Sequence, residues 1–140
     1  MKIILASKSG VRKKILEKNG ISYNAIPSNV DEDQVKDSLL AAGANPTLIS
    51  KNLAELKSIK VSSKYPDNLV LGADSVISLN NELINKPKTR EEGLKILRKL
   101  NGSVHYLITS VCISKNSAMI WNFTDHSELK MKKLSDEQLA

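Results

Sequence analysis

The feature that most constrains the fold is an apolar run in the middle of the chain, Leu69–Ile77, which carries one carboxylate. Short runs rich in Val, Leu and Ile are typical of strands buried on both faces of a sheet. An ionised Asp74 inside such a strand is costly unless it is paired, binds a cation or lies where the strand opens into a cleft. Gly72 and Ala73 leave room there for a ligand to approach the backbone. The alternative is that residues 72–75 form a bulge or turn in which Asp74 caps its own backbone.

The composition predicts one soluble domain in the cytoplasm. The 140 residues are enough for one core, and the single Cys112 excludes a disulfide framework. The first residues are too short an apolar segment for a secretory signal, and no run is long enough to cross a bilayer. The net charge is +6, but 18 of the 21 basic residues are Lys and aromatic residues make up only 4%. Because proteins that read nucleic acids rely on Arg and aromatic side chains, we do not expect nucleic acid as a partner. Since no run is long enough to cross a bilayer, we do not expect a membrane as a partner either.

The chain opens with a predicted strand, a Ser-rich turn and a predicted helix. Residues 2–6 are typical of a short buried strand, and the helix is expected from about Gly10 to Asn19. Val11, Ile15 and Leu16 share one side of that helix, which supports a helical structure for these residues.

The turn between this strand and helix is suited to binding an anion. Free backbone N–H groups and the helix dipole favour negative charge at a helix N-terminus. Ser7 and Ser9 add hydroxyl donors, and Arg12 in the first turn can hold a phosphate through two parallel hydrogen bonds. The alternative is that Ser9 only caps the helix and Arg12 is only a solvated charge.

An acidic triplet, residues 31–33, follows a second predicted strand at Ser22–Ile26. Three adjacent carboxylates can collect a divalent cation, which prefers oxygen ligands. They are also typical of a helix N-terminus, and residues 35–42 have a helical pattern. The spacing does not decide between the two interpretations.

Two lysines lie in positions from which they can reach Asp74 or its ligand. Lys57 belongs to a helix that starts at Asn45 and runs to about Val61, and it is either a ligand contact or a solvated surface charge. Lys86 follows a hairpin predicted at residues 80–81, which returns the chain toward Asp74. The following Pro87 forces extended backbone at Lys86, which favours a fixed phosphate partner.

The remaining segments complete an α/β pattern. A helix is expected from Thr89 to Leu100, followed by long strands over residues 104–114 and 117–132. Residues 135–140 start another helix with a capping-box pattern.

In order and spacing these segments resemble the Maf family of nucleoside triphosphate pyrophosphatases. The matching segments are Ala6–Arg12, Asp31-Glu32, Leu53–Ser58, Gly72–Val76, Lys86-Pro87, Leu100–His105 and the Leu-Ser-Asp-Glu start at Leu134. Three departures stand out. Gly10 and Val11 replace the Pro and first Arg of the family's Ser-rich turn, and Ser75 stands where the family commonly has Thr or Gln. The family's later Gly-Ala-Tyr and Gly-Asp…Gly-Leu-Pro segments do not occur, so we expect residues 1–140 to form a single Maf-like domain truncated at its C-terminus.

The resemblance implies a fold, a reaction and a set of site residues. The fold is an ITPase-like, elongated mixed α/β sheet flanked by helices, with two lobes around a central cleft. The protein is expected to be a homodimer that hydrolyses standard or non-standard nucleoside triphosphates to the monophosphate and pyrophosphate. The alternative is a truncated, catalytically impaired Maf-like protein that binds nucleotide.

The resemblance also implies a role for each site residue. Asp74, Lys86 and Glu32 are expected to be catalytic, with Glu32 and Asp74 binding Mg²⁺ or Mn²⁺ as the cofactor. The residues expected to bind substrate are Ser7, Ser9, Arg12, Lys57 and Ser75.

Overall fold

The computed structural model describes residues 3–7, 9–85 and 87–135. In chain order its elements are β1 (Ile3–Leu5), α1 (Gly10–Lys18), β2 (Tyr23–Ala25), α2 (Glu32–Ala41), α3 (Pro46–Ser62), β3 (Val70–Leu79), β4 (Glu82–Ile84), α4 (Arg90–Leu100), β5 (Val104–Lys115) and β6 (Ala118–Lys130). Within the described ranges, no helix is long and apolar enough to cross a membrane.

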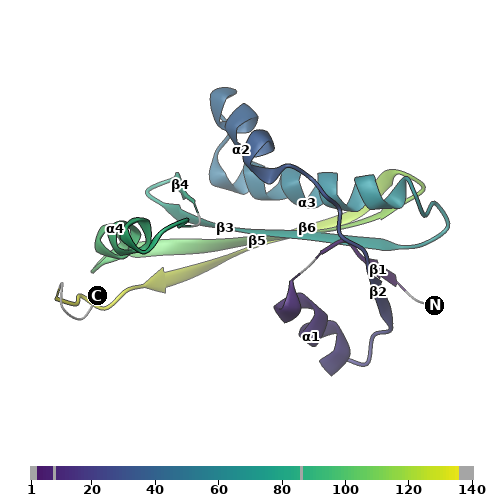
Figure 1. The fold of residues 1–140 in the computed structure, drawn as a ribbon, viewed down its shortest axis with the longest axis horizontal. Helices are drawn as coiled ribbons and strands as arrows, with labels where there is room; N and C mark the ends of the chain where they lie inside the picture. The colour runs from purple at the N-terminus through teal and green to yellow at the C-terminus, as the bar shows by residue number, and fades with distance from the viewer. Residues whose placement is uncertain (1–2, 8, 86, 136–140) are drawn as a thin grey trace.

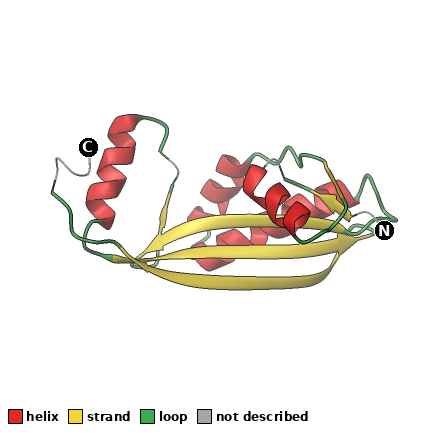
Figure 2. Cartoon of the chain, turned by 90° about the horizontal axis from the view of Figure 1, so that it is seen from below, coloured by secondary structure: helices red, strands yellow, loops and turns green. Residues whose placement is uncertain are grey.

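The strands form one mixed sheet that runs the length of the molecule (Figures 1 and 2). Its order is β2-β1-β3-β5-β6, and the short strand β4 pairs with the end of β3. β1 is parallel to both of its neighbours, whereas β3, β5 and β6 are antiparallel. The elongated mixed sheet flanked by helices confirms the expected α/β fold class.

Helix α3 covers one face of the sheet and forms the core with β3 and β5. Asn45 caps the helix by accepting a hydrogen bond from the Leu48 N–H at 2.9 Å, and Pro46 occupies the first turn. Four buried side chains fill the space between helix and sheet: Ile49, Leu53, Val76 and Ile108. A smaller cluster lies where α3 passes over β1 and joins Ile4, Ala6, Val61 and Val70.

The central run is a regular strand, so the alternative of a bulge or turn at residues 72–75 is wrong. Each residue from Val70 to Ser78 has its own partner on β5, with no break in register. Gly72 leaves space for helix α3 rather than for a ligand. A Cβ added at Gly72 would lie 2.5 Å from the Ala54 carbonyl oxygen, so glycine is needed for this helix–strand contact.

Helix α1 lies on the opposite side of the sheet from α3 (Figure 1). The structure confirms the helix expected from about Gly10 to Asn19, but the three apolar residues on one side of it differ in burial. Leu16 is buried, whereas Val11 is 69% exposed and Ile15 54% exposed. Periodicity identifies an apolar face, but it does not determine whether the described residues cover that face.

The far end of the sheet carries the hairpin and α4. Asn80 and Asn81 have φ values of 51° and 63°, as a two-residue hairpin turn of this kind requires, which confirms the predicted hairpin. β4 pairs with Ile77–Leu79, and α4 follows from the Thr89 cap. The helix expected after Leu134 lies outside the described residues from residue 136 onward.

Candidate active site

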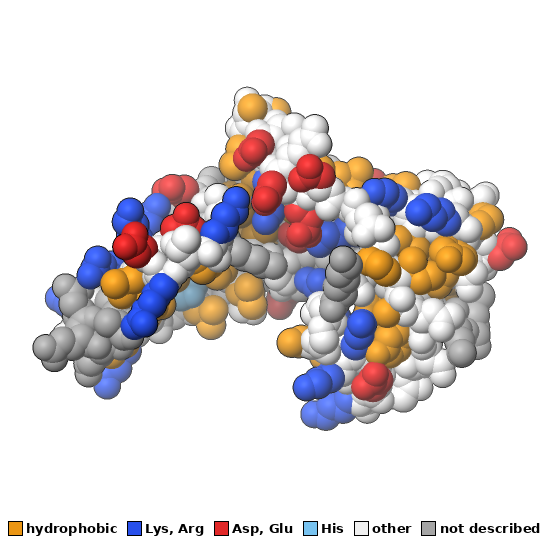
Figure 3. Space-filling view, in the orientation of Figure 1, with side chains coloured by type: hydrophobic (Ala, Val, Ile, Leu, Met, Phe, Trp, Pro, Cys, Tyr) orange, Lys and Arg blue, Asp and Glu red, His pale blue; other side chains and the backbone are white. Residues whose placement is uncertain are grey.

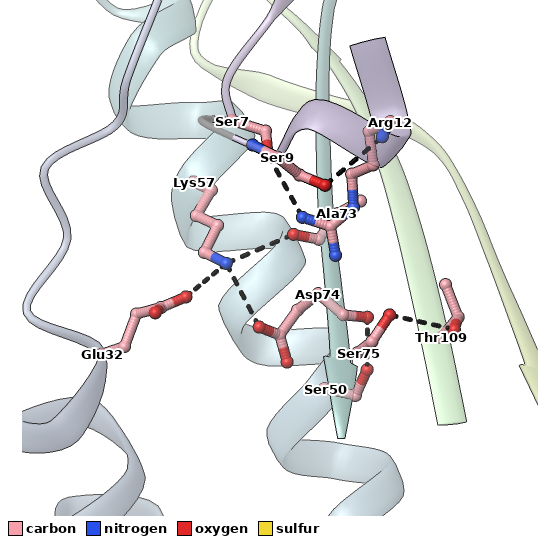
Figure 4. A network of polar contacts seen from close by, with 10 residues as sticks. All are labelled: Ser7, Ser9, Arg12, Glu32, Ser50, Lys57, Ala73, Asp74, Ser75 and Thr109. Carbon is pink, nitrogen blue, oxygen red and sulfur yellow. Dashed lines mark hydrogen bonds and ion pairs between the residues drawn. The ribbon is translucent and has the colours of Figure 1, made fainter. Parts of the chain in front are cut away.

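Lys57 connects Asp74 with Glu32 at the junction of α2, α3 and β3 (Figure 4). Its ammonium forms ion pairs with Glu32 Oε1 and, at 3.1 Å, with Asp74 Oδ1. It also donates a hydrogen bond to the Ala73 carbonyl oxygen at 3.3 Å. Lys57 is only 9% exposed, so the alternative of a solvated surface charge is wrong.

Each of these residues is positioned by its own element. Asp31 caps α2 by accepting a hydrogen bond from the Gln34 N–H at 3.2 Å, which places Glu32 in the first turn. The acidic triplet therefore does start a helix, and its middle residue, Glu32, also forms an ion pair with Lys57. Lys57 lies on α3 between Ala54 and Ser58, which contact Gly72 two residues before Asp74.

Asp74 is a buried carboxylate, and one of its two oxygens accepts no hydrogen bond from the described residues. The residue is 5% exposed, and its Oδ2 atom has no hydrogen-bond partner within the described ranges. Burial raises the pKa of the Asp74 carboxyl above its ordinary value, although the charge and hydrogen bond of Lys57 oppose this shift. A carboxylate with a raised pKa and a free oxygen is suited to accept a proton.

The Ser-rich turn forms a polar cavity next to Lys57. Ser7 Oγ accepts hydrogen bonds from the Ser9 N–H and from Arg12 Nη1, both at 3.1 Å. Ser9 Oγ caps α1 by accepting from the Arg12 N–H at 3.3 Å, so the capping role of Ser9 is confirmed. The cavity measures about 430 Å³, and its lining includes all three residues together with Glu32 and Lys57.

A second hollow of about 740 Å³ adjoins the first, and Glu32 lines both. Its walls come from α2, the β4 hairpin and α4, and side chains of both charges gather around this end of the molecule (Figure 3). Asn85 and Pro87 line it, so the hairpin does return toward the carboxylates as expected. Lys86 itself lies outside the described residues, and its catalytic role stays a prediction.

Ser75 is the one expected substrate-binding residue that the structure separates from the others. Successive side chains on a strand point to opposite faces, so Ser75 points away from α3 while Asp74 points toward it. Ser75 Oγ lies 3.0 Å from Thr109 Oγ1 on β5 (Figure 4). Its role in binding substrate stays a prediction.

Sequence reasoning missed two contributors to the site. Ser50 on α3 donates a hydrogen bond to the Asp74 carbonyl oxygen at 3.1 Å and fixes the strand at that position. The loop of residues 27–30 lines the smaller cavity, and Asn29 there has a φ of 55° while its carbonyl accepts from Lys60 at 2.7 Å. An Asn in a short polar loop is the only sequence signal for such a backbone conformation.

Comparison with known proteins identifies the family. The sequence profile of the Maf-like protein family matches residues 2–140. The chain belongs to the Maf-like protein family. A nucleoside triphosphate pyrophosphatase of Pelagibacter ubique is 60% identical over 133 residues, which are 95% of this chain and 68% of that relative. A 7-methyl-GTP pyrophosphatase of Rhizobium etli is 34% identical over 139 residues, which are 99% of this Maf-like chain and 70% of that relative.

Solved structures agree with the Maf-like fold. The Ham1 protein of Staphylococcus aureus superposes with a TM-score of 0.56 and 17% identity, over 93% of this chain and 71% of that one. A HAM1 protein of Coxiella burnetii gives a TM-score of 0.57 and 15% identity, over 91% of this chain and 70% of that one. At these identities the similarity shows the fold.

Proposed function

We propose that this Maf-like protein is a nucleoside triphosphate pyrophosphatase in which Asp74 activates the attacking water. The two relatives described above are named as pyrophosphatases, which supports hydrolysis of a nucleoside triphosphate over binding alone. The observation that carries the assignment of Asp74 is its buried carboxyl, whose pKa is raised and whose Oδ2 atom has no partner among the described residues.

The triphosphate is bound by the Ser-rich turn. The first N–H groups of a helix have no acceptor within the helix, so the start of α1 favours an anion. The hydrogen bond from Arg12 Nη1 to Ser7 Oγ holds the guanidinium at the cavity, where it neutralises phosphate charge. Lys57 lines the same cavity and connects the phosphate site with Asp74.

Hydrolysis follows from these positions. A water oxygen attacks the α-phosphorus, the bond from that phosphorus to the oxygen bridging the α- and β-phosphates breaks, and the water proton passes to Asp74 Oδ2. Pyrophosphate leaves with the bridging oxygen. Arg12 and Lys57 stabilise the negative charge of the transition state. The products are the nucleoside monophosphate and pyrophosphate.

The two carboxylates fit a divalent cation, Mg²⁺ or Mn²⁺, as the cofactor. Glu32 and Asp74 pair with the same ammonium through Oε1 and Oδ1, so a cation at that position would meet both carboxylates. Within the described part of the chain, no group of three or more acidic, His or Cys side chains converges. Mg²⁺ is commonly held by one or two carboxylates plus substrate phosphates, and when bound it supplies Lewis-acid neutralisation of phosphate charge.

We propose further that the protein forms a homodimer in the cytoplasm, where nucleoside triphosphates occur. β6 is the last strand of the sheet, and Trp121 and Phe123 on it are 49% and 56% exposed. Their ring centroids are 6.3 Å apart in a stacked arrangement, and a long exposed edge strand favours pairing with another strand. Trp121→Lys should then convert a dimer to a monomer in light scattering; a wild-type monomer would contradict the proposal.

The test of the catalytic proposal is pyrophosphate release from a panel of nucleoside triphosphates with Mg²⁺ or Mn²⁺. Asp74→Asn should lower the rate by about a hundredfold or more, as expected for loss of a general base. Asp67→Asn is the matched control, because Asp67 is an exposed acid before β3. Equal rates for wild type and Asp74→Asn would refute the role of Asp74. Nucleotide-dependent thermal stabilisation without any release would favour binding alone.

A further inference from the structure

The ammonium of Lys57 occupies the position between the two carboxylates expected to bind metal. An ammonium has three N–H donors, and three acceptors meet it here: Glu32 Oε1, Asp74 Oδ1 and the Ala73 carbonyl oxygen. The side chain is 11% exposed. Lys57 is therefore a buried, fully bonded cation in the centre of the site.

The packing of α3 on β3 brings the ammonium to this position. Helix α3 packs against β3 so closely that Gly72 has no space for a side chain next to Ala54 and Ser58. The hydrogen bond from Lys57 to the Ala73 carbonyl oxygen ties the side chain to the β3 backbone as well. These contacts favour the position between the carboxylates for the ammonium in the free protein.

A free divalent cation therefore meets an incomplete and partly neutralised site. Two carboxylates share one ammonium, so a cation gains little net attraction and is repelled at short range by Lys57. Mg²⁺ gives up its water reluctantly, and the described residues offer it no third acidic, His or Cys ligand. Asp74 Oδ2 stays available, because it is buried and has no partner among the described residues.

We propose that Lys57 holds the place of the cation in the free protein, so that a divalent cation enters only as its nucleotide complex. The inference rests on the proposed function for the identity of the nucleotide. The triphosphate oxygens supply the ligands that the chain lacks, while Arg12 and the Ser-rich turn bind the phosphate charge next to Lys57. Glu32 and Asp74, the two carboxylates that pair with Lys57 in the free protein, would be the protein ligands of the bound cation, while Asp74 Oδ2 stays available to the attacking water.

The test measures binding of Mn²⁺, a spectroscopic substitute for Mg²⁺, through the loss of the free-ion signal in electron paramagnetic resonance. The free protein should show no stoichiometric Mn²⁺ binding below the millimolar range. With a nucleoside triphosphate analogue that has a methylene group between its α- and β-phosphates, one Mn²⁺ per chain should stay with the protein in equilibrium dialysis, beyond the Mn²⁺ held by the analogue alone. Submillimolar, stoichiometric binding of Mn²⁺ to the free wild type would overturn the inference without any variant.

Lys57→Met provides the second arm, because methionine keeps a long buried side chain and removes the charge. Its affinity for Mn²⁺ without nucleotide should rise by about tenfold or more, equivalent to about 1.4 kcal/mol. Lys51→Met on the same helix is the control: Lys51 is exposed, and its affinity should match the wild type. If Lys57→Met unfolds, Lys57→Gln replaces it; an affinity equal to or below that of the wild type would contradict the inference.

These outcomes separate the inference from the proposed function. Pyrophosphate release by a protein that binds Mn²⁺ tightly without nucleotide refutes the inference and leaves the function intact. Joint binding of Mn²⁺ and analogue, without turnover of the natural triphosphate, supports the inference and refutes the function.

Discussion

Gly72→Ala should damage stability and catalysis together, because Gly72 sets the distance between α3 and β3. An added Cβ would lie 2.5 Å from the Ala54 carbonyl oxygen, 2.7 Å from the Ser58 nitrogen and 2.8 Å from Ser58 Cβ. Ordinary contact begins at 3.4 Å, so the helix has to move away by about 0.9 Å. Two of the three atoms are backbone, which cannot change rotamer to make room. Overpacking of this kind costs about 1–3 kcal/mol, so the free energy of unfolding in urea should fall by that amount.

The same displacement should lower activity beyond the effect of unfolding. Lys57 lies between Ala54 and Ser58 on α3, and Asp74 lies two residues after Gly72, so the movement separates the 3.1 Å ion pair. A misplacement of about 1 Å in an active site can reduce the rate by about a hundredfold. The assay is kcat/KM for pyrophosphate release at a temperature where the variant is fully folded.

Gly93→Ala is the matched control for this prediction. The nearest atom to its added Cβ is Pro87 Cβ at 3.7 Å, an ordinary contact. Because Gly93 is inside α4, alanine there should raise the free energy of unfolding by up to about 1 kcal/mol. If Gly72→Ala retained both the stability and the activity of the wild type, the close α3–β3 contact would be refuted.

Three further predictions follow from the buried and charged groups. Because burial raises the pKa of the Asp74 carboxyl, the folded protein binds this proton more tightly than the unfolded chain does. The contribution of Asp74 to the free energy of unfolding should therefore fall as pH rises from the ordinary carboxyl pKa through the pKa in the folded protein, while activity rises. In urea titrations, the free energy of unfolding of Asp74→Asn should lack this pH dependence and should be no lower than that of the wild type at pH 7. Arg12→Lys removes the two-pronged contact with phosphate, so KM for the triphosphate should rise by about tenfold with a smaller change in kcat; an unchanged KM would exclude Arg12 from binding. Cys112 is 2% exposed and burial raises the pKa of its thiol to about 11, so a disulfide reagent should react with it only on unfolding; rapid labelling of the native protein would contradict the packing of β5.

The sequence was sufficient to predict the helices and strands. Apolar runs, caps and the turn at Asn80 identify strands and helices through local chemistry, and the structure confirms them. The convergence of Glu32, Lys57 and Asp74 could be expected only through the family resemblance, since the three residues lie on separate elements.

Three features required the tertiary structure. The need for glycine at residue 72 comes from a helix that passes over the strand, and no local pattern encodes that distance. The exposure of Val11 and Ile15 depends on which surface lies opposite α1. In a regular strand, alternation places Ser75 on the opposite face from Asp74. The sequence also allowed a turn at residues 72–75, so only the observed register shows that the strand is regular there.

We propose that this Maf-like protein cleaves the bond between the α- and β-phosphates with water activated by Asp74. The most direct measurement is ³¹P nuclear magnetic resonance of the products formed from a nucleoside triphosphate with Mg²⁺, by the wild type and by Asp74→Asn. We expect equal amounts of nucleoside monophosphate and pyrophosphate for the wild type and unchanged substrate for the variant. Nucleoside diphosphate with free phosphate, or the same products at the same rate from both proteins, would contradict it.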